Sequence, residues 1–121
     1  MEPVYINPKD IAHRSDTVVY NGVAYVAGVV PSDNSGSTAD QARRILDEID
    51  SRLAAAGTDK SRLLSATIWM VEVDRDFAEF NKVWNAWLAP GRKPARACVQ
   101  AGLVGDAMIE VAVIAAVQGQ D

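Results

Sequence analysis

The sequence predicts an α+β protein in which two helices pack on one face of a mixed β-sheet. Three observations support this prediction. Several short segments are rich in β-branched residues, two longer segments repeat apolar residues at helical spacing, and turn-forming residues separate them. The expected element order is β-β-α-β-α-β-β, preceded by a short edge strand at residues 4–6. Each helix has a single apolar face, so both must bury that face against the same side of the sheet.

The first two strands of the sheet are predicted by the segment DTVVYNGVAYVAG at residues 16–28. Apolar-rich runs flank Asn21 and Gly22, and both residue types accept the positive φ angles that a type I′ turn requires. A tight hairpin is therefore expected here. The segment PSDNSGS at residues 31–37 is a polar loop that leads into the first helix.

The first helix is predicted to begin at Thr38, which acts as N-cap and is followed three residues later by Gln41 in a capping-box pattern. Gly57 ends the helix, because glycine accepts the left-handed conformation that commonly follows a helical segment. The apolar residues that recur at helical spacing between these limits are Ala42, Ile45, Leu46, Ile49 and Leu53.

Residues 64–73 are rich in β-branched and aromatic side chains and are predicted to form a long strand. The second helix then opens at Asp74 or Asp76, and Pro90 with Gly91 stops it. Its expected apolar face consists of Phe77, Phe80, Trp84, Trp87 and Leu88.

The final segment, KPARACVQAGLVGDAMIEVAVIAAV at residues 93–117, is read as two apolar strands around a turn at residues 102–106. A hairpin centred near Leu103 places Arg96 opposite Glu110, and opposed residues of an antiparallel pair share a face. Cys98 falls in the same neighbourhood. This register is an assumption, and a slip of one residue puts the two charges on opposite faces.

Two interpretations of this charged pair remain open. Arg96 and Glu110 could form a structural ion pair, because a carboxylate buried among apolar residues needs a cationic or hydrogen-bonding partner. Alternatively, the pair is a small anion site. The planar fork of arginine matches a carboxylate in two parallel bonds, and a nearby glutamate can hold or deprotonate a water molecule.

Other candidate residues carry weaker signals. Cys98 without an adjacent base reads as a small buried residue, and His13 reads as a surface or packing residue of an N-terminal loop. Asn81 is either exposed or directed into a pocket. Trp84 and Trp87 lie at helical spacing with the other apolar residues of their helix, which indicates core packing. No metal-binding cluster, phosphate loop or nucleotide fingerprint is found in the sequence.

Composition narrows the class of protein. The 121 residues, expected to form one domain over residues 1–121, carry a net charge of −4 and have a pI near 4.9. Nucleic-acid binding usually needs a basic stripe, and Arg43 and Arg44 lie among acidic residues instead. The single cysteine allows no internal disulfide, and no targeting segment or apolar run of membrane-spanning length is found. A cytoplasmic protein is therefore expected, with no nucleic acid and no membrane as partner.

The last strand is apolar on both of its faces. Ile109, Val111 and Val113 alternate with a second set formed by Ala112, Ile114 and Ala116. Since both helices cover one side of the sheet, a monomer would leave the second set in water. We therefore expect an oligomer that packs sheet against sheet.

The run KPARACVQAGL followed by IEVAVIAA resembles the C-terminal signature of the reactive intermediate deaminase family, also called Rid, YjgF or endoribonuclease L-PSP-like. That signature reads P-x-R-x-x-V, a turn, and a strand with V/I-E-I/V. The similarity extends back to HRSDTVVYNGVAYVAG. The stretch from residue 41 to residue 88 is most similar to the YoaB-type branch.

The resemblance implies a chorismate-mutase-like fold, a homotrimer with clefts between subunits, and hydrolysis of 2-imino acids or their enamine tautomers to 2-oxo acids and ammonia without a cofactor or metal. Arg96 matches the arginine that binds the substrate carboxylate, and Glu110 matches the glutamate that positions water. Cys98 matches a cysteine whose backbone lines the cleft, and Asn81 matches a cleft asparagine.

Several positions depart from the family pattern around the cleft. Ala27 stands where the better-known deaminases have a serine, and Ala112 replaces a second glutamate. His13 and Arg14 occupy the region of a pocket tyrosine. These positions bear on substrate choice. Three alternatives are weighed against deamination: a non-catalytic trimer that binds a small carboxylate metabolite, RNA cleavage or translation inhibition, and holdase activity.

Overall fold

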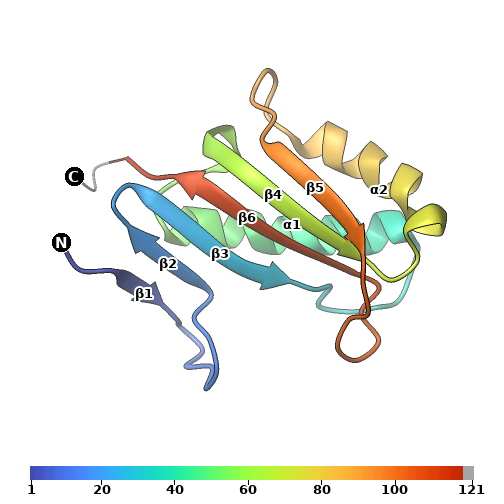
Figure 1. Cartoon of the computed structure of the whole chain (residues 1–121), viewed down its shortest axis with the longest axis horizontal. Coiled ribbons are helices and arrows are strands. Elements are labelled where there is room, and N and C mark those ends of the chain that lie inside the picture. The colour runs from blue at the N-terminus through green and yellow to red at the C-terminus, as the bar shows by residue number, and fades with distance from the viewer. Residues whose placement is uncertain (119–121) are drawn as a thin grey trace.

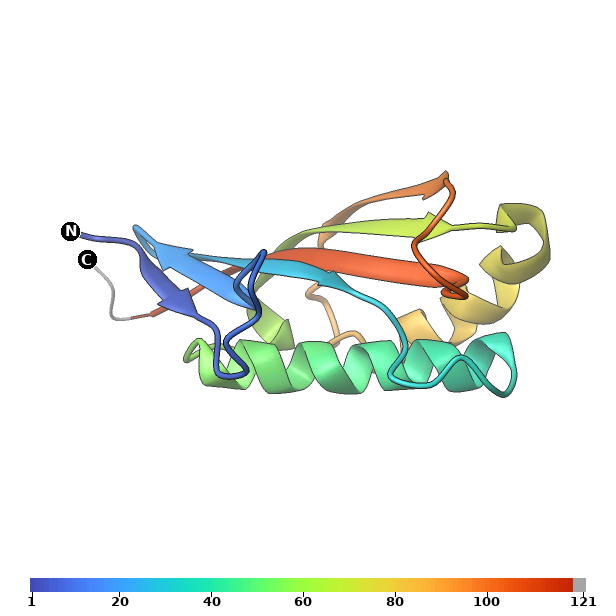
Figure 2. The same cartoon turned by 90° about the horizontal axis from the view of Figure 1, so that it is seen from below.

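The computed structural model describes residues 1–118, and these form one six-stranded sheet with two helices on one face (Figures 1 and 2). The strands are β1 (Val4–Ile6), β2 (Thr17–Tyr20), β3 (Val23–Val29), β4 (Leu63–Met70), β5 (Ala95–Gln100) and β6 (Ile109–Ala116). The helices are α1 (Thr38–Ala55), α2 (Val73–Trp87) and a short 3₁₀ turn, η1 (Lys60–Arg62). The predicted α+β class with both helices on one side is confirmed. Residues 119–121 of the expected domain lie outside the described part.

The strand order β1-β2-β3-β6-β4-β5 shows that the predicted C-terminal hairpin is wrong. β5 pairs in parallel with β4, and β4 pairs antiparallel with β6, so β4 separates the two strands expected to be partners. The physical reason is the α2 crossover. A helix that connects two strands returns the chain to the end of the sheet where β4 began, so β5 runs parallel to β4 at the sheet edge.

The N-terminal hairpin forms as predicted. Asn21 and Gly22 have φ angles of 52° and 77°, the left-handed conformation that a two-residue turn between β2 and β3 requires. β1 pairs with β2 as the edge strand. β3 contains a bulge between Val26 and Val29, where its register with β6 shifts.

The first turns of the two helices contact each other. Ser37, rather than Thr38, caps α1 in a capping box with Asp40. Thr38 instead donates its hydroxyl to Asp76 Oδ1 of α2 at 2.9 Å, and α2 begins at Val73, earlier than predicted. Hydrogen bonds from Arg75 and Thr38 hold the pKa of the buried Asp76 carboxyl below its usual range. These contacts orient α2 relative to α1.

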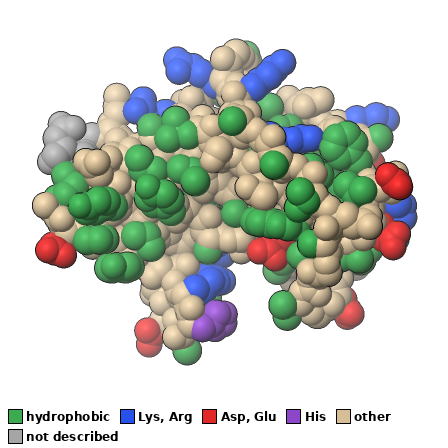
Figure 3. Space-filling model, viewed as in Figure 1, with side chains coloured by type: hydrophobic (Ala, Val, Ile, Leu, Met, Phe, Trp, Pro, Cys, Tyr) green, Lys and Arg blue, Asp and Glu red, His purple; other side chains and the backbone are tan. Residues whose placement is uncertain are grey.

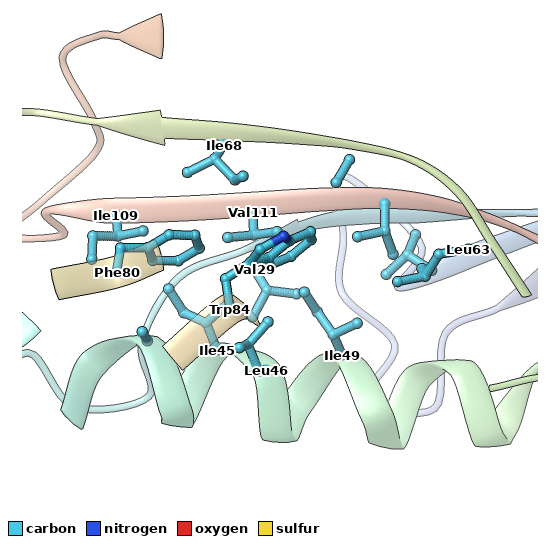
Figure 4. Packing of buried hydrophobic residues seen from close by; sticks show 14 of the residues in the cluster. Val29, Ile45, Leu46, Ile49, Leu63, Ile68, Phe80, Trp84, Ile109 and Val111 are labelled. Atoms are coloured by element: carbon cyan, nitrogen blue, oxygen red, sulfur yellow. The ribbon is translucent and has the colours of Figure 1, made fainter. Parts of the chain in front are cut away.

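The hydrophobic core lies between the sheet and the helices (Figure 4). α1 contributes its whole predicted apolar face. α2 buries only Phe80 and Trp84 of its predicted set, whereas Phe77 stays 41% exposed. The strands contribute alternate residues, among them Ile68 of β4 and Val111 of β6. Burial of this apolar surface is the main force that holds the two layers together.

The other face of the sheet is covered by no element of residues 1–118 (Figure 2). Hydrophobic side chains gather on it over the middle of the sheet (Figure 3). Tyr25, which opposes Ile114 of β6, is 48% exposed, and Val99 of β5 is 44% exposed. We call this surface the open face.

None of the helices in the described residues has the length and apolarity needed to cross a membrane.

Candidate functional site

Arg96 lies in the edge strand β5 and points to the helix-covered side of the sheet. It is in register with Ala66 of β4, a core residue that is 3% exposed. Its guanidinium carbon lies 5.7 Å from the ring centroid of Phe77 and 5.6 Å from that of Trp84, both on α2. Within residues 1–118 the side chain of Arg96 takes part in no ion pair and no hydrogen bond. The guanidinium therefore keeps its N–H donors available for a ligand.

A hollow of about 660 Å³ opens beside Arg96, between α2, the loop that follows it and the start of β5. Asn81 and Trp84 of α2 line it together with Arg96. Asn81 Oδ1 is buried and has no hydrogen-bond partner in the described residues. A buried polar atom without a partner costs free energy, so a ligand or water that donates to it would be favoured. The hollow thus combines an unpaired cation with an unused acceptor.

Cys98 lies on the same side of β5 as Arg96 and packs against the hydrophobic core. Burial raises the pKa of its thiol, and the nearby charge of Arg96 only partly opposes that effect. Because the thiolate is the reactive form, a raised pKa keeps the side chain protonated at neutral pH. A packing role fits this environment, and Cys98 is not among the residues that line the hollow beside Arg96.

Glu110 lies on the open face, because it is in register with Trp69 of β4, whereas its neighbours Ile109 and Val111 point into the core. Its carboxylate rests against Gly28 of the β3 bulge, where a Cβ atom would overlap with Oε2. Within residues 1–118 no ion pair involves Glu110. Gly28 therefore provides the space that the carboxylate occupies.

The predicted register that placed Arg96 opposite Glu110 is wrong, because β4 lies between their strands and the two side chains project from opposite faces of the sheet. A structural ion pair between them within one chain is thereby excluded. The structure brings Arg96 and Asn81 together, with Cys98 next to them. It leaves Glu110 across the sheet.

The N-terminal loop lines a second hollow of about 440 Å³, which Gly28 also borders. Arg14 from this loop pairs with Asp16 at 2.6 Å, and Asp16 also lies 3.6 Å from Arg52 of α1. His13, in contrast, is exposed. Among residues 1–118, no group of three or more His, Cys, Asp or Glu side chains could hold a metal ion.

Phe77 and Gly28 were missed as site residues. Phe77 was assigned to the core because its spacing fits the apolar face of α2. A signal was present, since Phe77, Asn81 and Trp84 stand at positions i, i+4 and i+7 and share one stripe of the helix. The contact between Gly28 and Glu110 depends on the β3–β6 pairing, which no local pattern reveals.

The fold and the sequence together define the class of this protein. Residues 6–117 match the family described as Endoribonuclease L-PSP. The chain belongs to this family, which includes the YjgF, RutC and Rid proteins.

Individual relatives support the same assignment. The chain is 40% identical to a RutC family protein of Haemophilus ducreyi over 92% of its length and 96% of the relative's. It is 38% identical to the RutC family protein YoaB of Escherichia coli, over 88% and 92% of the two chains. A crystal structure of a YjgF family member from Neisseria meningitidis superposes with a TM-score of 0.91 at 37% identity and covers 98% of both chains.

Proposed function

We propose that the protein hydrolyses reactive 2-imino acids and their enamine tautomers to 2-oxo acids and ammonia. One observation carries this proposal: the Arg96 guanidinium has no ion pair within residues 1–118 and borders a hollow that also contains the unpartnered Asn81 amide oxygen. An arginine fork binds a carboxylate through two parallel hydrogen bonds, which fixes the plane of the ligand. The Asn81 amide oxygen can accept a hydrogen bond from the N–H of an imine or amine.

Glu110 supplies the second part of the proposed site, from a neighbouring copy of the chain. Since Arg96 and Glu110 project from opposite faces of one sheet, a two-fold contact of open face on open face would leave both Arg96 side chains on the outside. A ring in which the β5 edge of one copy meets the open face of the next brings Arg96 to Glu110. Such a ring also covers the apolar residues of the open face, and a homotrimer is the assembly we propose.

The chemistry needs only orientation and proton transfer. Glu110 accepts a proton from a water molecule while the oxygen of that water forms a bond to the imine carbon. Glu110 returns the proton taken from water to the nitrogen, which gives a neutral carbinolamine. The carboxylate then moves the hydroxyl proton of the carbinolamine to its amino nitrogen as the C–O bond becomes a carbonyl, and the C–N bond breaks to release ammonia and the 2-oxo acid. Imines hydrolyse in water already, so proton transfer by a positioned side chain, typically about 10²–10⁴-fold, suffices for useful acceleration.

A coupled assay tests this function. An enzyme that releases 2-aminoacrylate supplies the imine, and semicarbazide competes for it as a chemical trap. We expect the protein to accelerate imine loss and to lower semicarbazone formation. Saturable binding of pyruvate with unchanged imine decay would instead support the non-catalytic carboxylate-binding trimer. A salt-sensitive shift of RNA would support the nucleic-acid alternative.

The oligomer is expected to be a stable trimer at micromolar concentration. An apolar open face and an incomplete site in each chain both require a neighbouring copy. Sedimentation equilibrium measures the mass directly. A persistent monomer would contradict the proposed site, because Glu110 and Arg96 could not act on one ligand.

Replacement of Gly28 by alanine is expected to lower turnover about tenfold and to leave folding intact. The added Cβ displaces the Glu110 carboxylate, which is the flexible end of a side chain and can move aside without disturbing the sheet. A displacement of this kind misaligns the attacking water, and small misplacements have large rate effects. Kinetics and thermal unfolding of the same preparation separate the two effects. A marked loss of melting temperature with normal turnover would contradict this role of Gly28.

A further inference from the structure

Phe77 is an exposed aromatic side chain on a helix whose other aromatic residues pack inward. It is 41% exposed, whereas Phe80 and Trp84 of the same helix are 0% and 3% exposed. The ring of Phe77 is therefore only partly packed against the core, and it lies within cation–π distance of the Arg96 guanidinium.

The neighbours of Phe77 on α2 suggest what this contact does. Phe77, Asn81 and Trp84 occupy successive turns of one helical stripe, and the first and last Cα atoms lie roughly 10 Å apart along the axis. The Arg96 guanidinium lies within cation–π distance of both rings, at 5.7 Å and 5.6 Å. The two rings therefore hold the cation beside the Asn81 amide, at the border of the hollow.

We propose that Phe77, together with Trp84, is a positioning residue that holds the Arg96 guanidinium ready for a carboxylate ligand. The inference rests on the proposed function only in taking Arg96 as the carboxylate-binding group. Phe77 itself contacts neither ligand nor water in this scheme. It acts through Arg96.

An aromatic neighbour suits this task better than an acidic one. A carboxylate beside Arg96 would also orient the guanidinium, but it would occupy the N–H donors and neutralise the charge that the ligand needs. A ring attracts the cation through its π face and uses none of those donors. Arginine otherwise populates many rotamers, and ligand binding would have to restrict them, so a guanidinium held in place binds more tightly.

The test uses two substitutions at one position. Phe77→Leu keeps much of the apolar volume and removes the π face, whereas Phe77→Tyr keeps the ring. Cation–π contacts at partly exposed sites are modest, so we expect Phe77→Leu to raise the Kd for pyruvate and the KM for 2-iminopropanoate about three- to tenfold. The kcat is expected to change less than about twofold, since a bound carboxylate orients the fork by itself. Phe77→Tyr is expected to show the wild-type Kd for pyruvate and the wild-type KM for 2-iminopropanoate.

Val104→Ala is the control for loss of an exposed apolar side chain, because Val104 is 94% exposed and lies in the loop between β5 and β6, outside the hollow beside Arg96. We expect it to leave the Kd for pyruvate unchanged. Calorimetric titration gives the Kd, and sedimentation with thermal unfolding shows whether each variant keeps its assembly and stability. Equal pyruvate affinity of Phe77→Leu and the wild type, or equal weakening in the Leu and Tyr variants, would overturn the inference.

The inference and the proposed function fail in different ways. If the wild type binds pyruvate, hydrolyses no imine, and loses affinity on Phe77→Leu, the catalytic proposal is wrong and the positioning role of Phe77 stands. If imine hydrolysis is present and Phe77→Leu is kinetically normal, the positioning role is wrong and the catalytic proposal stands. A wild type that binds no pyruvate at millimolar concentration and does not accelerate imine loss contradicts both.

Discussion

Arg96→Lys is expected to lose roughly 30- to 1,000-fold in kcat/KM for 2-iminopropanoate, which corresponds to about 2–4 kcal/mol for one bidentate charged contact. Lysine keeps the positive charge, but its ammonium is a point charge that cannot make two parallel bonds to a carboxylate. The plane of the ligand is then no longer fixed. If that plane directs the imine carbon towards the attacking water, kcat falls as well as the affinity. Steady-state kinetics on a preparation shown to be trimeric gives both values.

Arg92→Lys provides the matched control for this substitution. Arg92 is an exposed arginine in the loop before β5 and does not line the hollow that contains Arg96. The control variant is expected to show wild-type kinetics. A folded, trimeric Arg96→Lys protein with near wild-type efficiency would contradict the assignment of Arg96 as the carboxylate-binding residue.

Glu110→Gln is expected to lower kcat by at least about 10²-fold and to leave the melting temperature and the assembly unchanged. The amide has nearly the same shape and still forms hydrogen bonds, but it cannot take a proton from water. Stability is expected to hold, because no ion pair within residues 1–118 depends on Glu110. Turnover and thermal unfolding are measured on one preparation.

Glu72→Gln is a suitable control, since Glu72 is exposed and its side chain makes no capping hydrogen bond at the start of α2. Its turnover is expected to match the wild type. The opposite pattern for Glu110→Gln, a lower melting temperature with normal turnover, would show that Glu110 stabilises a contact between subunits. It would then have no part in the chemistry.

The elements and several of their boundaries could be predicted because the signals for them are local. Helical spacing of apolar residues predicted both α1 and α2, and Asn21 with Gly22 predicted the turn between β2 and β3. The predicted first residues of the two helices were less accurate. Ser37 and Thr38 are both good capping residues, and the choice depended on Asp76 of α2, a distant partner that holds the Thr38 hydroxyl.

Arg96 and Glu110 were also identified in the sequence, since an arginine and a glutamate in otherwise apolar strands are costly without a function or a partner. The sequence did not predict how these two residues are placed relative to each other. The register assumed that consecutive strands pair, and β4 in fact inserts between β5 and β6. The surroundings of Arg96 also differ from the expectation, because Phe77 and Trp84 contact its guanidinium in place of a carboxylate.

The sequence by itself determined which segments form helices and strands, which face of each helix is apolar, and which charged residues are candidates for the site. These properties depend on residues close together along the chain, and side-chain periodicity reports them directly. The tertiary structure alone decided that Arg96 and Glu110 lie on opposite faces of one sheet. Strand order depends on which of several distant segments of similar apolarity pair with one another. It is settled by the path of the α2 crossover and by burial across the whole sheet, which no single segment encodes.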